Sequence, residues 1–234
     1  MLIARAAELR AVRQRLNMNT DLRDADFGQF CDFVFARPVS RDPASKWYWD
    51  LSSEVCVDPS RAVSYLTELC QGPRDLLDDY TPAQIAEGLG YLFGPGGGST
   101  FRDQLWNPEV AWEDRKRCIE LLPRMHFELF EEGGEGFGDL PFMLWDLIAF
   151  GYDAGTREAS SSLEDARVQT EMYKALCTML ESDNAVTQRS AIHGLAHLRH
   201  SGGDSALRTF LKGASRLERD VKSYAEGVLE GHWL

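Results

Sequence analysis

The chain has 234 residues, which is enough to bury roughly 70–75% of its unfolded surface in one or two cores. A hydrophobic content of 44% and an aromatic content of 11% are typical of a folded globular protein and exclude an intrinsically disordered one. The net charge of -12 excludes a general nucleic-acid binder, because phosphate binding requires a basic face, and it favours a basic partner.

Residues 1–20 differ from the rest of the chain in charge, since four arginines and one glutamate give them a net charge of +3. Their apolar residues recur at helical spacing, which predicts an amphipathic helix. Three interpretations remain open: a docking or dangling helix, a basic interaction arm, and a transit peptide. No stretch of the chain has the apolar length of a secretory signal or a membrane span, so we expect no membrane association.

An aromatic-rich segment follows. If 27–35 is a helix, Phe33 and Phe35 point away from its core stripe and lie over the loop that carries Trp47 and Trp49. We expect both tryptophans to be buried, but one that stays exposed would be a natural anchor for a partner, because interfaces are enriched in tryptophan.

Several helices are predicted from their start and stop signals. Asp58 and Pro59 begin a helix that Gly72 ends, and Thr81, Pro82 and Gln84 form a capping box with proline at the first helical position. Between these two helices, Asp75, Asp78 and Asp79 lie on one face if the segment is helical. Their order, D-x-x-D-D, reverses the D-D-x-x-D magnesium motif of class I isoprenoid synthases, so a short charged helix is the preferred interpretation.

In the second half of the chain, Pro108 is predicted to begin a helix that Pro123 kinks or restarts. The run 142–148 is apolar enough for a buried helix, and Ser162 caps a long one. Two more helices are expected near 185–200 and 215–230. No stretch shows sustained strand alternation, so the predicted fold class is all-α: stacked antiparallel helical hairpins forming an α-α superhelix, or an irregular helical bundle.

The predicted organisation is a basic segment at 1–20, an aromatic-rich helical part at 21–150, a polar linker at 151–162 and helical hairpins at 163–234. We expect 21–234 to form one continuous domain. Five cysteines, dispersed and odd in number, indicate reduced thiols in a cytoplasmic protein.

Three glycines lie inside otherwise amphipathic helical stretches, namely Gly88, Gly194 and Gly227. A glycine inside a helix costs about 1 kcal/mol relative to alanine, so its repeated use suggests a packing reason. The expected reason is a neighbouring helix whose backbone comes too close to leave room for a Cβ atom, as in stacked helical hairpins.

A weak repeat accompanies these glycines, because 190–195 and 223–228 are offset by 33 residues and share a serine and a glycine. The acidic turn at 180–186, followed by Arg189, Ala191, Leu195 and Leu198, resembles a HEAT-type repeat, although the arginine lies three residues after Val186. The resemblance covers about 164–230, with a looser echo at 59–93. It implies an α-solenoid whose concave face binds a partner.

His193, His197 and His200 fall within an arc of about 60° on one helix face, opposite the apolar side. They are therefore predicted to form an outward-facing stripe. Three interpretations are open: solvated surface, a partner contact, and a metal site that uses His193 and His197.

No complete catalytic constellation is present, so we expect a non-catalytic protein-binding module of the helical-repeat type, without a cofactor. Its candidate partner-binding residues are His193, His197, His200, Trp47 and Trp49. The alternative is an all-α metal-dependent enzyme that uses either the three histidines or Asp75, Asp78 and Asp79. The partner is expected to be another protein rather than nucleic acid or membrane, and the oligomeric state is left open.

Overall fold

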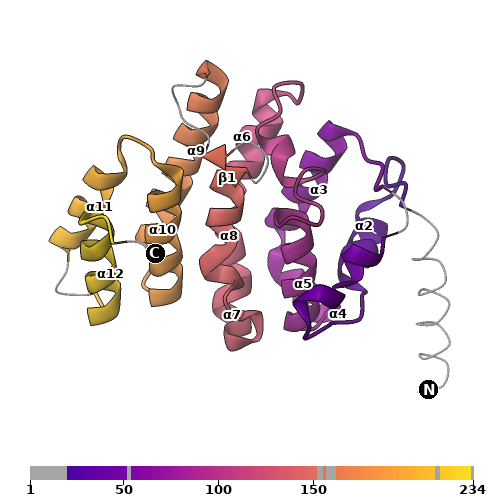
Figure 1. Ribbon diagram of the computed structural model, residues 1–234, viewed down its shortest axis with the longest axis horizontal. Helices are drawn as coiled ribbons and strands as arrows, with labels where there is room; N and C mark the ends of the chain where they lie inside the picture. Colours follow the sequence, from indigo (N-terminus) through magenta and orange to yellow (C-terminus); the bar gives the residue numbers. More distant parts are fainter. Residues whose placement is uncertain (1–19, 52–53, 152–154, 157–161, 214–216, 233–234) are drawn as a thin grey trace.

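The computed structural model describes residues 20–51, 54–151, 155–156, 162–213 and 217–232, and within them the fold is all-α, as predicted. The helices stand side by side along the longest axis of the molecule, from α2 at one end to α11 and α12 at the other (Figure 1). The predicted segment at 1–20 lies almost wholly outside the described residues.

The described α-helices are α2 (Phe27–Phe35), α3 (Pro59–Gln71), α4 (Leu76–Asp79), α5 (Pro82–Phe93), α6 (Trp112–Leu121), α7 (Glu131–Gly133), α8 (Leu140–Ala149), α9 (Leu163–Leu180), α10 (Ala185–Leu198), α11 (Gly203–Lys212) and α12 (Arg219–Leu229). A π-helical segment, Met125–Phe130, precedes α7, and 3-10 turns occupy Pro43–Ser45, Trp47–Asp50, Pro73–Asp75, Arg102–Leu105 and Gly134–Phe137. Two-residue strands β1 (Phe150–Gly151) and β2 (Gly155–Thr156) pair antiparallel at the start of the predicted linker.

Local capping chemistry explains where the best-predicted helices begin. Thr81 and Gln84 form the reciprocal capping box of α5, with Pro82 at the first helical position. The Ser162 hydroxyl accepts the backbone N–H of Asp165 at 2.9 Å and caps α9. These starts were predicted because each depends on only a few consecutive residues.

The predicted helix start at Pro108 is wrong, because α6 begins at Trp112. The side chain of Asn107 accepts the backbone N–H of Glu109 at 2.9 Å, and the Asn107 carbonyl accepts that of Val110 at 3.1 Å. This Asx turn competes with the helix and delays its start past the proline.

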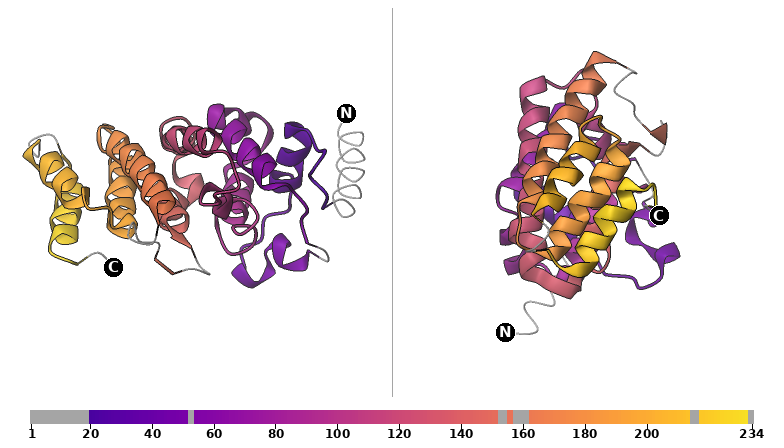
Figure 2. Two further views of the ribbon diagram at one scale, coloured as in Figure 1. Left: turned by 90° about the horizontal axis from the view of Figure 1, so that it is seen from above. Right: turned by 90° about the vertical axis from the view of Figure 1, so that its left-hand side faces the viewer.

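Helices far apart in the sequence pack in a regular order. α3 contacts α6, α6 contacts α9, and α9 contacts α11; likewise α5 contacts α8, α8 contacts α10, and α10 contacts α12. Viewed from above, α9 and α10 lie next to α11 and α12 along the row (Figure 2). The α6–α9 and α8–α10 contacts cross the predicted linker at 151–162, and the buried apolar side chains form one core cluster.

Two of the three helical glycines, Gly88 and Gly194, leave no room for a Cβ atom, but the predicted close approach of a neighbouring backbone is wrong. A Cβ atom on Gly194 would lie 2.6 Å from Leu176 Cδ2 and 2.8 Å from Trp145 Cβ, and one on Gly88 would overlap the Phe35 ring. The space is taken by neighbouring side chains rather than by a neighbouring backbone. Gly227 does not fit the prediction, because a Cβ there would meet only ordinary contacts at 3.4 Å and beyond.

Two further observations concern the cysteines and the apolar character of the helices. All five cysteines are unpaired thiols, and Cys31, Cys70 and Cys118 are buried. Among the described helices, none combines the length and the apolar character that a membrane crossing requires.

Candidate functional site

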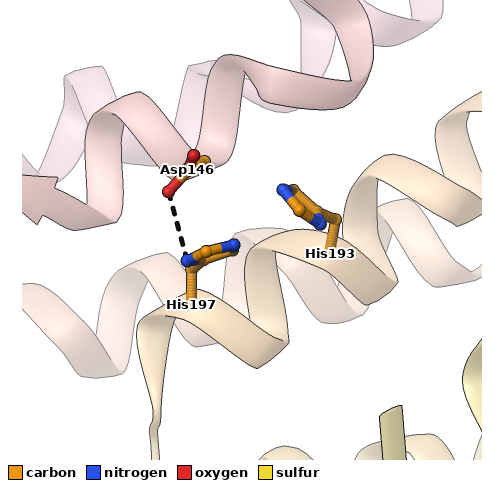
Figure 3. Close-up of side chains that lie close together, drawn as sticks. All are labelled: Asp146, His193 and His197. Carbon is orange, nitrogen blue, oxygen red and sulfur yellow. Dashed lines mark ion pairs between the residues drawn. The ribbon is translucent and has the colours of Figure 1, made fainter. Parts of the chain in front are cut away.

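The candidate site lies between α8 and α10. α10 contributes His193 and His197, which are one helical turn apart, and α8 contributes Asp146 (Figure 3). Each of the three side chains offers one ligand atom, and these atoms all lie within 4.8 Å of one another. It is the one group of three or more potential metal-ligating side chains that the described part of the chain contains.

His197 and Asp146 form the most direct contact in the site. His197 Nδ1 lies 3.1 Å from Asp146 Oδ1, and the ring of His197 is 4.5 Å from that of His193, centroid to centroid. The side chains of His197 and Asp146 keep 16% and 23% of their exposure. The site is thus partly open to solvent on the side of these two residues.

His193 lies deeper and is held from two other directions. Its ring stacks on Phe142 of α8 at 4.1 Å, and its Nδ1 lies 2.8 Å from the hydroxyl of Tyr224 on α12. The residue is 6% exposed, and its Nε2 is buried without a hydrogen-bond partner. A buried polar atom in this condition requires an explanation, because an unmade hydrogen bond costs about 1–3 kcal/mol.

Burial lowers the pKa of both imidazoles. The pKa of His193 falls to about 4, mainly through desolvation, with a smaller effect from His197. Desolvation also lowers the pKa of His197; Asp146 opposes this shift and Arg199 adds to it. Both rings are therefore neutral near pH 7, which is the protonation state that binds metals.

The predicted outward-facing stripe is wrong. α10 contacts α8, α9 and α12, so its histidine side is buried as well as its apolar side. The amphipathic pattern reveals one buried face, but it does not show that the opposite face is also covered.

His200 does not join the other two histidines. It follows the end of α10, after Arg199 with a φ of 51°, and stacks on Tyr173 at a centroid distance of 4.3 Å. Its Nδ1 accepts the backbone N–H of Gly202 at 3.1 Å. The left-handed residue turns the chain away before the third histidine, so the predicted three-residue face does not form.

Asp75, Asp78 and Asp79 are exposed and form no group with other potential metal ligands among the described residues. Asp78 and Asp79 belong to the four-residue helix α4, which precedes the Thr81 cap. This is the short charged helix that the residue pattern predicted.

Trp47 and Trp49 lie in one 3-10 turn but differ in exposure. Trp47 is half-buried and packs edge-on against Phe33 at 5.9 Å, as predicted, and against Tyr91 at 4.7 Å. Trp49 keeps 48% of its exposure, contrary to the expected burial, and its Nε1 donates to the Pro43 carbonyl at 3.0 Å.

Asp146 and Tyr224 were not predicted as site residues from the sequence. One signal for Asp146 was present, since it is the single charged residue in the apolar run 142–148. A carboxylate within a buried helix requires a partner, which indicates a functional or paired position. Tyr224 carried no comparable signal.

No family model matches this sequence, and comparisons with curated proteins and with solved structures also found no match. The function is therefore inferred from the geometry of the chain itself.

Proposed function

We propose that this chain is a non-catalytic protein-binding module of the helical-repeat type. The order of helix contacts supports it, because α5, α8, α10 and α12 pack one after another along a row, as do α6, α9 and α11. A row of this kind is what a HEAT-like solenoid would form, and solenoids offer an extended surface for partners.

The observation that carries the proposal is the exposed Trp49. Large aromatic residues dominate binding energy at protein interfaces when they are presented in a fixed conformation. The hydrogen bond from Trp49 Nε1 to Pro43 fixes the indole, and the Tyr48 ring packs edge-on against it at 4.7 Å. Val39, 45% exposed, adds a second large apolar side chain from the same connection between α2 and α3.

A partly buried ion pair ties this connection to the helical scaffold. Lys46 Nζ lies 2.7 Å from Glu87 Oε2 on α5, and the same oxygen accepts the backbone N–H of Ser40 at 3.1 Å. The Glu87 side chain is 3% exposed. The segment that carries Trp49 is thus anchored at two points, which lowers the entropy cost of binding through it.

The proposed partner is a protein with a basic surface, because the chain carries a net charge of -12. The proposed compartment is the cytoplasm, which the five unpaired thiols support. Nucleic acid is disfavoured as a partner by the same charge balance.

A comparison of two exposed residues tests this function. Trp49→Ala and Leu163→Ala each remove a large exposed apolar side chain, with Leu163 89% exposed on α9 as the matched control. We expect quantitative affinity capture from the source cell to recover a defined partner with the unaltered chain and with Leu163→Ala. Trp49→Ala should weaken this recovery at least tenfold, consistent with about 2 kcal/mol for an aromatic anchor.

Circular dichroism melts of both variants control for folding. Equal recovery with both variants would remove Trp49 as the anchor. Failure of the unaltered chain to enrich any protein would contradict the binding function itself.

The alternative, an all-α metal-dependent enzyme, is favoured by a single arrangement within the described residues, that of Asp146, His193 and His197. A metal-dependent enzyme would turn over a substrate only with its metal bound, and Trp49→Ala would leave that rate unchanged. Activity assays on the chelated and metal-supplemented chain, with phosphate-ester, amide and nucleoside substrates, separate this alternative from the binding module.

A further inference from the structure

Three side chains with the donor atoms of a transition-metal site converge between two helices, and the binding function proposed above does not use them. Two imidazoles and one carboxylate are a donor set that Zn²⁺ binds well, whereas Mg²⁺ and Ca²⁺ prefer oxygen ligands throughout. The two histidines have the i, i+4 spacing that places neighbouring ligands on one helix face. Asp146 completes the group from the facing helix (Figure 3).

The second observation is the buried, unpartnered Nε2 of His193. The side chain is more than nine-tenths buried, and in Figure 3 its ring is inclined towards Asp146 and His197. Its other nitrogen, Nδ1, is engaged by Tyr224 at 2.8 Å. A metal-binding histidine typically has this arrangement, in which an outer partner holds one nitrogen and the other bears the lone pair for the metal.

We propose that Asp146, His193 and His197 bind one Zn²⁺ ion between α8 and α10, with Tyr224 as the outer partner of His193. In this site Nδ1–H of His193 donates to the Tyr224 hydroxyl, and Nε2 binds the metal. The ion satisfies the free Nε2 of His193 and links α8 to α10, the two helices that pack most extensively among the described elements.

The observed spacing requires only a small adjustment. Zinc–ligand bonds of about 2.0–2.1 Å place tetrahedral ligand atoms roughly 3.3 Å apart. Asp146 Oδ1 and His197 Nδ1 already approach to 3.1 Å, and zinc binding at this Nδ1 places the ring proton of His197 on Nε2. The three ligand atoms all lie within 4.8 Å of one another, a spread that side-chain rotation closes. The partial exposure of Asp146 and His197 provides the entry path.

Three protein ligands leave one tetrahedral position for water or an exchangeable ligand. Phe142 shields the site on one side by stacking on His193. The structural consequence is a cross-link from α8 to α10 that extends through Tyr224 to α12.

Zinc titration of the full chain tests the proposal. The affinity tag is removed, the protein is stripped with a chelator, and ZnCl₂ is added during isothermal titration calorimetry. We expect one Zn²⁺ per chain, and a melting temperature that rises by about 5–10 °C at a free zinc concentration 100 times the Kd. MgCl₂ at the same concentration should leave the melting temperature unchanged.

Four variants locate the site. Tyr224→Phe removes the outer partner and should weaken zinc binding about 10–100-fold. His193→Ala and Asp146→Asn each remove a metal ligand and should weaken zinc binding by more than that. His200→Ala is the matched control, because it removes a histidine that is just beyond the same helix but outside the site, and it should bind zinc like the unaltered chain.

Folding and the tautomer are measured separately. Asp146→Asn keeps the shape of the side chain. A native circular dichroism spectrum together with lost zinc binding would therefore show that the loss comes from the missing carboxylate ligand and not from misfolding. Long-range ¹H–¹⁵N spectra of the stripped chain should show the Nδ1–H tautomer of His193. The proposal is overturned if the unaltered chain binds no zinc, if His193→Ala or Asp146→Asn binds it normally, or if His200→Ala is as damaging.

Discussion

His126 is fully buried in the π-helical segment Met125–Phe130, and neither of its ring nitrogens has a hydrogen-bond partner. Its ring packs edge-on against Phe130 at 5.0 Å. Desolvation lowers its pKa to about 3, so the native state holds this imidazole neutral well into the acid range.

This burial predicts a specific loss of stability in acid. Well above pH 6.5 the ring is neutral in both the folded and the unfolded state and contributes no pH dependence. As the pH falls below 6.5, the unfolded state binds a proton that the native state cannot bind, so the free energy of unfolding decreases. The loss between pH 7 and pH 4.5 is roughly 2–3 kcal/mol from this residue.

His126→Leu tests the effect, because it keeps an apolar side chain of similar size and removes the titrating group. Urea unfolding from pH 7 to pH 4.5 should show a shallower decrease of the free energy of unfolding in the variant. Three other histidines with lowered pKa values, His193, His197 and His200, are present in both proteins and cancel in the difference. Parallel curves would show that His126 gains a proton without unfolding.

At the scale of single helices, the sequence predicts those features that depend on contacts between neighbouring residues. The capping box at Thr81 and the serine cap at Ser162 involve neighbouring residues, so both helix starts were predicted. α11 was not predicted, and its N-cap residue Gly202 has no side chain to mark its start.

The candidate site was only half predictable for a related reason. The spacing of His193 and His197 is a property of one helix, whereas the positions of Asp146 and Tyr224 depend on how α8 and α12 pack around it. Trp49 was expected to be buried with Trp47. A 3-10 turn has three residues per turn, so side chains two residues apart point in different directions. Such tertiary contacts cannot be derived from periodicity alone.

The helical glycines give a prediction about packing between elements. Gly194→Ala should lower the free energy of unfolding by about 1–3 kcal/mol, because the new Cβ would overlap Leu176 and Trp145. Leu176 can rotate away, but Trp145 Cβ is fixed by its own backbone on α8. The loss therefore measures how tightly α8 approaches α10.

Gly90→Ala is the matched control, since it also lies inside a helix and a Cβ there would meet nothing within 4 Å. It should raise the free energy of unfolding by about 0.5–1 kcal/mol through helix propensity alone. Chemical denaturation of both variants measures the difference. Equal effects would mean that the glycine in α10 has no packing role.

At the scale of the whole molecule, a row of helices implies uneven stability. α3 buries six of its residues, whereas α12 buries only Val221 and Ala225. α11 and α12 lie at the end of the row and contact α9 and α10 on one side (Figure 1). In a linear array the terminal units open before the interior ones, because each unit is stabilised by its neighbours.

Amide hydrogen exchange tests whether the proposed array behaves in this way. We expect α11 and α12 to exchange well before α3, α8 and α10. Val221→Ala, which removes one of the two buried side chains of α12, should speed exchange in α11 and α12 by about fivefold for each kcal/mol lost and leave α3 unchanged. If the variant accelerates all helices equally, the chain unfolds as one cooperative unit. A solenoid would then be the wrong description of how its helices support one another.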